Sequence, residues 1–293
     1  MGIDGESPSA LPAITWGRVA CRWQTVPGTE ADNRRTIVII SHHGVDLDLD
    51  LYPLQTGDCT HPAVLVLPGG GFREHTEHDG QGYAHWLNRI GVHAAVLKYQ
   101  LAPDPFPMAL VQSRAALDAL RGGFLLANVD ASQVGVIGSS AGGLLAGLLA
   151  TGTTLSAEEA PQKGRRPEFH IQSYGLADLA LLPPSAVEAL LGDNIGWADE
   201  LSPSRHVDDA TSPTFVWATA PDPPGLPNAL EWARALAVHD VPFELHIYPE
   251  GWHGVGLADG VAYGSHGKEN IPHTAEWTAR CYEWLRHQDV NVG

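Results

Sequence analysis

The sequence predicts an α/β protein with a mostly parallel, eight-stranded sheet and helices on both faces. Short apolar runs alternate along the chain with amphipathic stretches of helix length, as strands and helices alternate around a parallel sheet. The runs after residue 60 are apolar at nearly every position, which is typical of strands covered by helices above and below. We therefore expect a single domain over residues 1–293.

Each element follows from its own pattern. The strand candidates are 35–40, 46–52, 62–67, 93–99, 134–138, 169–175, 214–219 and 243–248, and the helix candidates are 79–90, 107–122, 140–151, 227–239 and 273–287. The run DLDLDLY alternates acid and leucine, which predicts an antiparallel edge strand with Asp46, Asp48 and Asp50 on its solvated face. These aspartates do not predict a calcium loop, because the run has neither the glycine turn nor the closing glutamate of such a loop. Residues 152–212 interrupt the alternation, and we expect a cap-like insertion there.

The charge and composition of the chain limit the classes of partner that it can bind. The chain has 34 acidic against 17 basic residues, a formal charge of -17, so nucleic acid and anionic membrane surfaces would repel it. No basic segment followed by an apolar one begins the sequence, and no run of 18 apolar residues occurs. We expect a cytoplasmic protein that binds neither nucleic acid nor membrane. Cys21, Cys59 and Cys281 lack the spacing of a zinc or redox site and are interpreted as ordinary thiols.

The run VGVIGSSAGGLL at 134–145 carries the first chemical signal. A strand, the pattern G-x-S-x-G at 138–142 and a helix follow one another there, as in a nucleophile elbow. The flanking glycines indicate a backbone so sharply turned that any Cβ would collide with its neighbours. The elbow places Ser140 at a helix N-terminus, which favours developing negative charge. Ser140 is thus the predicted nucleophile, although a serine at this position could also be a simple helix N-cap.

A nucleophilic serine needs a base and an orienting acid, in the chain order Ser, Asp, His on this elbow. His253 follows the last core strand within the loop YPEGWHGVG, and Asp222 follows strand 214–219 within ATAPDPPGLP. We predict that they complete the triad. The competing residues after position 200 are His206, His239, His246, His266, His273, Asp208, Asp209 and Asp240. A surface loop histidine and a turn aspartate are the simpler alternatives.

A glycine-rich loop supplies the remaining part of such a site. In PAVLVLPGGGF, Gly70 and Gly71 can point backbone N–H groups at an oxyanion, and Ala141 after the nucleophile adds another donor. A phosphate-binding loop would continue with Gly-Lys-Ser/Thr, which is absent. The cluster HTEHD at 75–79 could hold a metal, but we interpret it as a solvated helix start or as polar lining of the acyl pocket. The sequence therefore predicts neither a cofactor nor a metal.

These motifs resemble a known superfamily. The matching segments are LPGGGF (67–72), VLKYQLAP (96–103), GSSAGG (138–143), ELSPSRHV (200–207), FVWATAPDPPGLP (215–227) and HIYPEGWHGVGLA (246–258). Over roughly residues 45–290 the chain is similar to the α/β-hydrolases, and more narrowly to their acetylesterase and xylan-esterase-like branch. In two places it departs from that branch. In the loop of the acid, Pro221 stands where that branch has the first of two aspartates, and the segment from Asp222 to Pro227 is one residue longer than in that branch. Ala218 stands where relatives often carry histidine.

The resemblance implies the α/β-hydrolase fold and a serine hydrolase of short acyl esters, often O-acetyl groups on sugars. The expected substrate is a small-molecule or carbohydrate ester, cleaved through an acyl-enzyme. An amide or peptide hydrolase, such as an arylformamidase or an aminopeptidase, would use the same triad. A pseudo-hydrolase that binds a ligand without turnover is the alternative from another class. A cysteine nucleophile, as in dienelactone hydrolases, is excluded because position 140 is serine.

Overall fold

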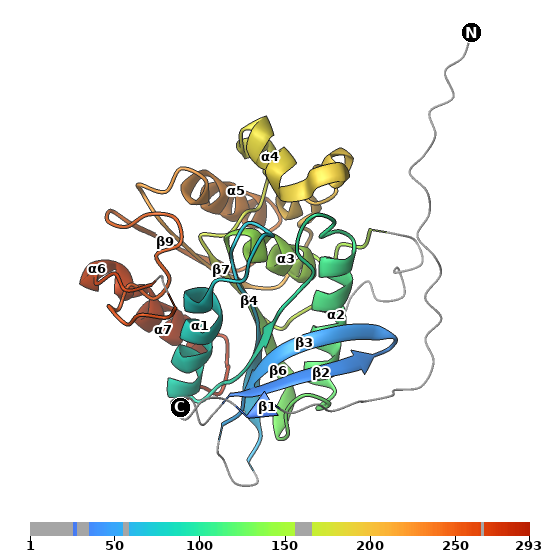
Figure 1. The fold of residues 1–293 in the computed structure, drawn as a ribbon. Helices are drawn as coiled ribbons and strands as arrows, with labels where there is room; N and C mark the ends of the chain where they lie inside the picture. Colours follow the sequence, from blue (N-terminus) through green and yellow to red (C-terminus); the bar gives the residue numbers. More distant parts are fainter. Residues whose placement is uncertain (1–25, 28–34, 55–58, 156–165, 265–266) are drawn as a thin grey trace.

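A nine-stranded sheet runs through the centre of the protein (Figure 1), in the order β1-β2-β3-β5-β4-β6-β7-β8-β9. The computed structural model describes residues 26–27, 35–54, 59–155, 166–264 and 267–293. The strands are β1 Val26–Pro27, β2 Thr36–His42, β3 Val45–Tyr52, β4 His61–Leu67, β5 His93–Leu97, β6 Val129–Ser139, β7 His170–Ser173, β8 Thr214–Thr219 and β9 Phe243–Tyr248. All eight predicted strands are present, and the two-residue β1 adds a ninth at the edge. The predicted α/β architecture with a mostly parallel sheet is confirmed.

Six neighbouring strands, from β5 to β9, are parallel, whereas β2 and β3 are antiparallel to their neighbours. Because the strands are parallel, their carboxyl ends meet at one edge of the sheet, where sites form in this class of fold. The loops that follow β4, β6, β8 and β9 all start from that edge. These are the loops in which the sequence places the predicted site residues.

Helices cover both faces of the sheet (Figure 1). They are α1 Glu77–Arg89, α2 Met108–Arg121, α3 Ser140–Ala150, α4 Pro184–Leu191, α5 Gly225–Val238, α6 Pro272–Ala275 and α7 Trp277–His287. Successive side chains of a strand point to opposite faces, so Leu65 and Leu67 of β4 join the core beneath α2 and α3. Val64 and Val66 instead join the core beneath α1 and α7. Both faces of the central strands are therefore buried, as the apolar runs predict.

Strand β3 corrects the expectation of a solvated edge. It lies between β2 and β5, because the strand at 36–42 folds back on it as a hairpin. Asp50 is consequently buried, and it forms ion pairs with Arg35 at 2.8 Å and Lys98 at 3.1 Å. Charge compensation, and not solvent, accommodates this carboxylate. Asp46 has the predicted exposure and the Asp48 side chain is 43% exposed, so the prediction of a solvated face fails only for Asp50.

Two further expectations are refined. The range 152–212 is divided by β7, and its later part holds α4 and three short 3-10 helices at Leu179–Leu181, Gly192–Trp197 and Pro203–His206. The predicted helix 273–287 is two helices, α6 and α7, separated at Glu276. Cys59 and Cys281 are free thiols, as expected, and Cys21 lies outside the described residues. Burial raises the pKa of the Cys281 thiol, which keeps it unreactive.

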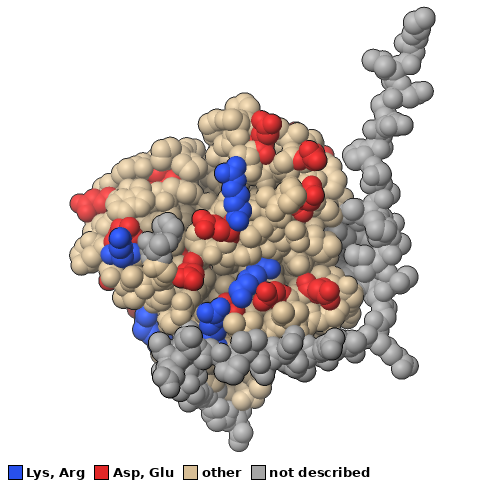
Figure 2. Space-filling model, in the orientation of Figure 1, with Lys and Arg blue, Asp and Glu red and all other residues tan. Residues whose placement is uncertain are grey.

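Among the described residues, no helix has both the length and the apolar character needed to span a bilayer. The cytoplasmic location stays a prediction. Figure 2 shows one face of the molecule, on which basic side chains are scattered among acidic ones. The coloured residues of that face form no continuous basic patch, and the absence of a nucleic-acid partner likewise stays a prediction.

Candidate active site

Ser140 sits on a strained turn between β6 and α3. Its φ is 51°, in the left-handed region that a residue with a side chain rarely adopts unless its surroundings impose it. A Cβ on Gly138 would overlap the carbonyl oxygen of Gly142, and one on Gly142 would overlap that of Leu67. Both glycines are therefore required for the turn. The N-cap of α3 is Ser139, not Ser140, which argues against the simple capping role.

His253 lies beside the serine. It comes from the loop after β9, and its Nε2 is 2.7 Å from Ser140 Oγ. Gly251 and Gly254 flank the histidine with φ of 119° and 86°, so the loop turns sharply on both sides of it. The His253 side chain remains 29% exposed, which leaves it open to a bound molecule. Among its predicted competitors, His246 instead contacts Glu244 at 2.6 Å on β9.

Asp222 lies on the other side of the His253 ring from Ser140. Both of its carboxylate oxygens lie 3.0 Å from His253 Nδ1, and the residue is only 1% exposed. The Gly225 amide donates to Asp222 Oδ1 at 2.7 Å, and a Cβ on Gly225 would overlap the same carboxylate. The loop that carries Pro221 therefore still places the acid against the histidine. Its competitor Asp208 pairs with Arg166 at 2.8 Å.

The glycine-rich loop after β4 faces the serine. Gly70 and Gly71 have φ of 125° and 63°, and together with Ser140 and His253 they line one cavity. The Gly70 carbonyl accepts the amides of Arg73 and Glu74, which closes a tight turn. Among the described residues, neither glycine amide donates to a backbone carbonyl. Both donors are thus available to a ligand.

Ala141, the third predicted oxyanion donor, does not itself line the cavity. It is fully buried in the first turn of α3, directly after Ser140. Backbone N–H groups in the first turn of a helix have no intrahelical acceptor. Its amide therefore belongs to the same end of α3 as the serine, where the helix dipole favours negative charge.

Asp79 is a residue of the site that the sequence reasoning missed. It is 2% exposed and accepts hydrogen bonds from the Gly69 amide at 3.2 Å and from Thr76 Oγ1 at 2.8 Å. The Tyr174 hydroxyl also donates to it. The expectation of a solvated helix start at HTEHD is therefore wrong for His78 and Asp79, both of which are buried. The available signal was that Asp79 lies one turn before Tyr83, on the same face of the predicted helix.

Tyr174 connects this buried carboxyl group to the histidine. Its ring lies 5.5 Å from the His253 ring, edge to face. Its hydroxyl contacts that of Tyr83 at 3.2 Å and accepts the Gly256 amide at 3.2 Å. Burial, followed by the nearby Asp79, raises the pKa of Tyr174 well above its usual value. The phenol therefore remains a neutral hydrogen-bond donor.

The cavity beside Ser140 has a volume of about 430 Å³. Ala186, Ala189 and Leu190 of α4 line it together with the glycine loop, Leu176 and Leu182. A concave site with an apolar wall and a few converging polar groups suits a small organic ligand. Sequence reasoning placed an insertion here without identifying these side chains.

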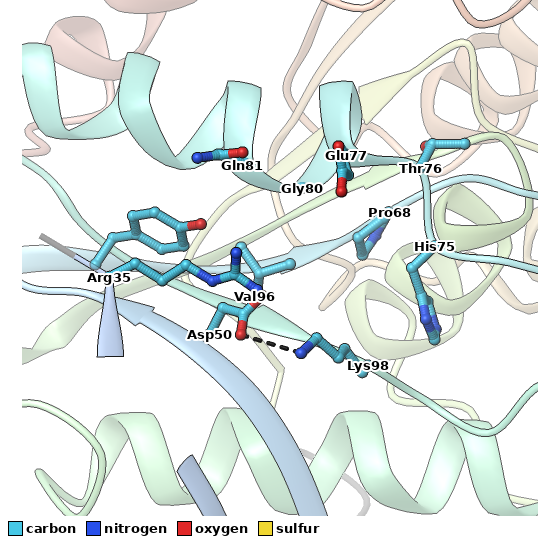
Figure 3. Close-up of a pocket in the computed structure, with 11 residues that line it drawn as sticks. Arg35, Asp50, Pro68, His75, Thr76, Glu77, Gly80, Gln81, Val96 and Lys98 are labelled. Atoms are coloured by element: carbon cyan, nitrogen blue, oxygen red, sulfur yellow. Dashed lines mark hydrogen bonds and ion pairs between the residues drawn. The ribbon is translucent and has the colours of Figure 1, made fainter. Parts of the chain in front are cut away.

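Pro68 and His75, which precede and follow the glycine loop, line a second, smaller cavity of about 230 Å³. Figure 3 shows Lys98 pointing at Asp50 beneath α1, with His75 to one side. Burial lowers the pKa of His75, so this imidazole is neutral at pH 7. The residues on either side of the glycine loop thus line a cavity that also contains the Asp50–Lys98 ion pair.

Comparison with known proteins places the chain in a family. The protein-family model BD-FAE matches residues 49–224, which include the glycine loop, Ser140 and Asp222. The chain belongs to the BD-FAE family of α/β-hydrolases. The BD-FAE match ends before His253, so the histidine rests on the geometry described above.

One solved structure similar to this BD-FAE protein is an acetyl ester-xyloside bifunctional hydrolase from Caldicellulosiruptor lactoaceticus. It has 33% sequence identity and a TM-score of 0.72, over 84% of this chain and 89% of that one. Among curated relatives, endo-1,4-beta-xylanase B of Butyrivibrio fibrisolvens is 28% identical over 219 residues. The acetylxylan esterase of Xylanibacter ruminicola is 26% identical over 212 residues. The matches cover 70% and 69% of this chain but only 34% and 42% of those two relatives.

Proposed function

We propose that this BD-FAE protein is a serine esterase that cleaves short-chain carboxylic esters. The observation that carries the proposal is the continuous relay from Ser140 Oγ to His253 Nε2 at 2.7 Å and from His253 Nδ1 to Asp222 at 3.0 Å. Nucleophile, base and orienting acid have the contacts that acyl transfer requires. Neither a helix cap nor a surface histidine needs a buried carboxylate behind it.

In the proposed mechanism, His253 takes the proton of Ser140 as its oxygen attacks the ester carbonyl. Asp222 holds the imidazole in the tautomer with a proton on Nδ1 and stabilises the imidazolium that forms. The amides of Gly70, Gly71 and Ala141 stabilise the oxyanion, and His253 returns its proton to the leaving alcohol. Water, activated by the same histidine, then attacks the acyl-enzyme and releases Ser140.

The proposed substrate is an O-acetyl ester on a sugar or another small molecule. The names of two relatives, an acetyl ester-xyloside hydrolase and an acetylxylan esterase, support this class. A cavity of about 430 Å³ has the size of small-molecule sites. We further propose that the chain is one domain, in which α4 acts as a cap whose apolar side chains exclude water from the acyl group.

Initial rates on p-nitrophenyl acetate, butyrate and octanoate, on acetylated xylo-oligosaccharides and on an aryl formamide test the proposal. The acetyl substrates should have the highest kcat/KM. Faster turnover of the formamide would overturn the ester assignment in favour of an amide hydrolase. A fluorophosphonate probe should label Ser140 and fail to label Ser140→Ala. An unlabelled wild-type protein without turnover of any substrate would mean a ligand-binding protein.

A further inference from the structure

Two histidines and an aspartate gather where the β2–β3 hairpin meets α2. His42 ends β2, His43 follows it in the turn with φ of 52°, and Asp118 lies in the last turn of α2. The Nε2 atom of each histidine is 3.6 Å from the same oxygen, Asp118 Oδ2. The cluster is distinct from the proposed active site, because none of its residues lines the cavity of Ser140.

The spacing of the three groups is close to that of metal ligands. One nitrogen of each ring and one carboxylate oxygen lie within 4.8 Å of one another. With bonds of about 2.0–2.1 Å, neighbouring ligands of a tetrahedral zinc ion lie roughly 3.3 Å apart. The observed 3.6 Å separations are slightly wider than that and too long for good hydrogen bonds. A contraction of a few tenths of an ångström would bring each histidine Nε2 to ligand spacing from Asp118 Oδ2. The ligand nitrogens of the two rings lie within 4.8 Å of each other and would have to close to a similar spacing around one ion.

His42 gives a second, independent indication. Its side chain is 1% exposed, and among the described residues neither ring nitrogen has a hydrogen-bond partner. A buried polar group without a partner is destabilising, and a metal bound at Nε2 would compensate one nitrogen. The ring is held in place by Phe124 at 5.2 Å and by His43 at 4.2 Å between centroids. The ligand atom is therefore aimed at the cluster by packing.

We propose that His42, His43 and Asp118 bind a zinc ion. Two imidazoles with one carboxylate favour zinc over magnesium and calcium, which prefer oxygen ligands. The strongly acidic chain also attracts cations. Three protein ligands leave the fourth position to water. Because the ion would join the hairpin to α2, its role is to stabilise the fold, not to take part in ester hydrolysis.

This site departs from the expectation of no metal. Two adjacent histidines are not a recognised ligand spacing, and Asp118 is distant from them in sequence. The positive φ of His43 lets both rings turn toward the same carboxylate, which adjacent residues of a regular strand would not do. Only the packing of α2 against the hairpin creates the cluster.

Metal titration of protein stripped with EDTA tests the proposal. Zinc should bind with one-to-one stoichiometry by calorimetry, and Co²⁺ should produce a visible d–d absorption band. At a free zinc concentration about 100 times Kd, the unfolding midpoint should rise by roughly 4–6 °C. Magnesium should leave the midpoint unchanged. Failure of the wild-type protein to bind zinc, or an equal shift with magnesium, would overturn the proposal.

Variants locate the ion. Asp118→Asn and His43→Ala should each weaken zinc binding at least roughly tenfold, and both positions are partly exposed, so folding should be preserved. His42→Ala should act in the same direction if it folds. The exposed His239→Ala is the matched control and should bind zinc as the wild type does. Unchanged affinity in Asp118→Asn would place the metal elsewhere and refute this site.

Discussion

The Tyr174 hydroxyl donates a hydrogen bond to Asp79, and Asp79 in turn contacts the glycine loop. Asp79 accepts the Gly69 amide, while the Tyr174 ring packs against His253. One buried carboxyl group therefore links the loop that carries Gly70 and Gly71 to the ring that packs against the proposed base. Neither Asp79 nor Tyr174 lines the cavity of Ser140, so both are positioning residues.

Removing this link should lower turnover more than binding. For Tyr174→Phe we expect kcat on p-nitrophenyl acetate to fall roughly tenfold with KM within about twofold, because misplaced oxyanion donors act on the transition state. Steady-state kinetics measures both constants. The matched control is Tyr282→Phe on α7, which should behave as wild type. A rise in KM at unchanged kcat would contradict the positioning role.

The orienting acid gives a second prediction. Asp222→Asn should reduce kcat by a factor on the order of 10³–10⁴ without loss of folded structure, because the amide no longer selects the tautomer that activates Ser140. Its competitor from the sequence, Asp240, lies exposed after α5, and Asp240→Asn should retain full activity. Activity and circular dichroism compare the two variants. Comparable losses in both would refute the assignment.

The elbow glycines should be essential for stability. In Gly142→Ala the new methyl group would overlap the Leu67 carbonyl, and we expect a loss of about 2–3 kcal/mol or failure to fold. Gly196 has no neighbour within 4 Å of an added Cβ, so Gly196→Ala should change the free energy of unfolding by less than about 1 kcal/mol. Urea denaturation measures both. An equally stable Gly142→Ala would mean that the turn can open.

Acid should destabilise the fold through His170. Burial lowers the pKa of this residue from 6.5 to about 3, so the folded protein keeps it neutral while the unfolded chain takes up a proton below pH 6.5. The contribution of His170 to the free energy of unfolding is therefore fully present above pH 6.5 and is lost as the pH falls from 6.5 toward 3. Between pH 7 and 5 the loss is about 2 kcal/mol.

The variant His170→Asn isolates this contribution. It should lower the free energy of unfolding at pH 7, because contacts with Gln172 and Thr214 are lost. Its pH dependence should be weaker than that of the wild type by about 2 kcal/mol between pH 7 and 5. Urea denaturation at both pH values provides the measurement, with the exposed His287→Asn as control. Parallel pH profiles of wild type and His170→Asn would contradict the prediction.

Local sequence determined the strands, the main helices and the elbow. Gly138 is required by a contact with Gly142, four residues along the chain, and Gly142 by contacts with Leu67 and Pro68 at the end of the neighbouring strand β4. The order of Ser140, Asp222 and His253 after successive strands predicted their meeting, because parallel strands present their carboxyl ends at one edge. These features depend on local backbone geometry and on sheet topology, both of which leave a pattern in the sequence.

Only the tertiary structure decided which polar groups become partners. The hydrogen bond from Tyr174 to Asp79, the burial of Asp50 beside Lys98 and the α4 side chains above Ser140 all join segments distant in sequence. The identity of a residue as aspartate does not show whether its side chain is solvated or buried. Its environment is set by the helix or strand that packs over it, and no local pattern encodes that neighbour.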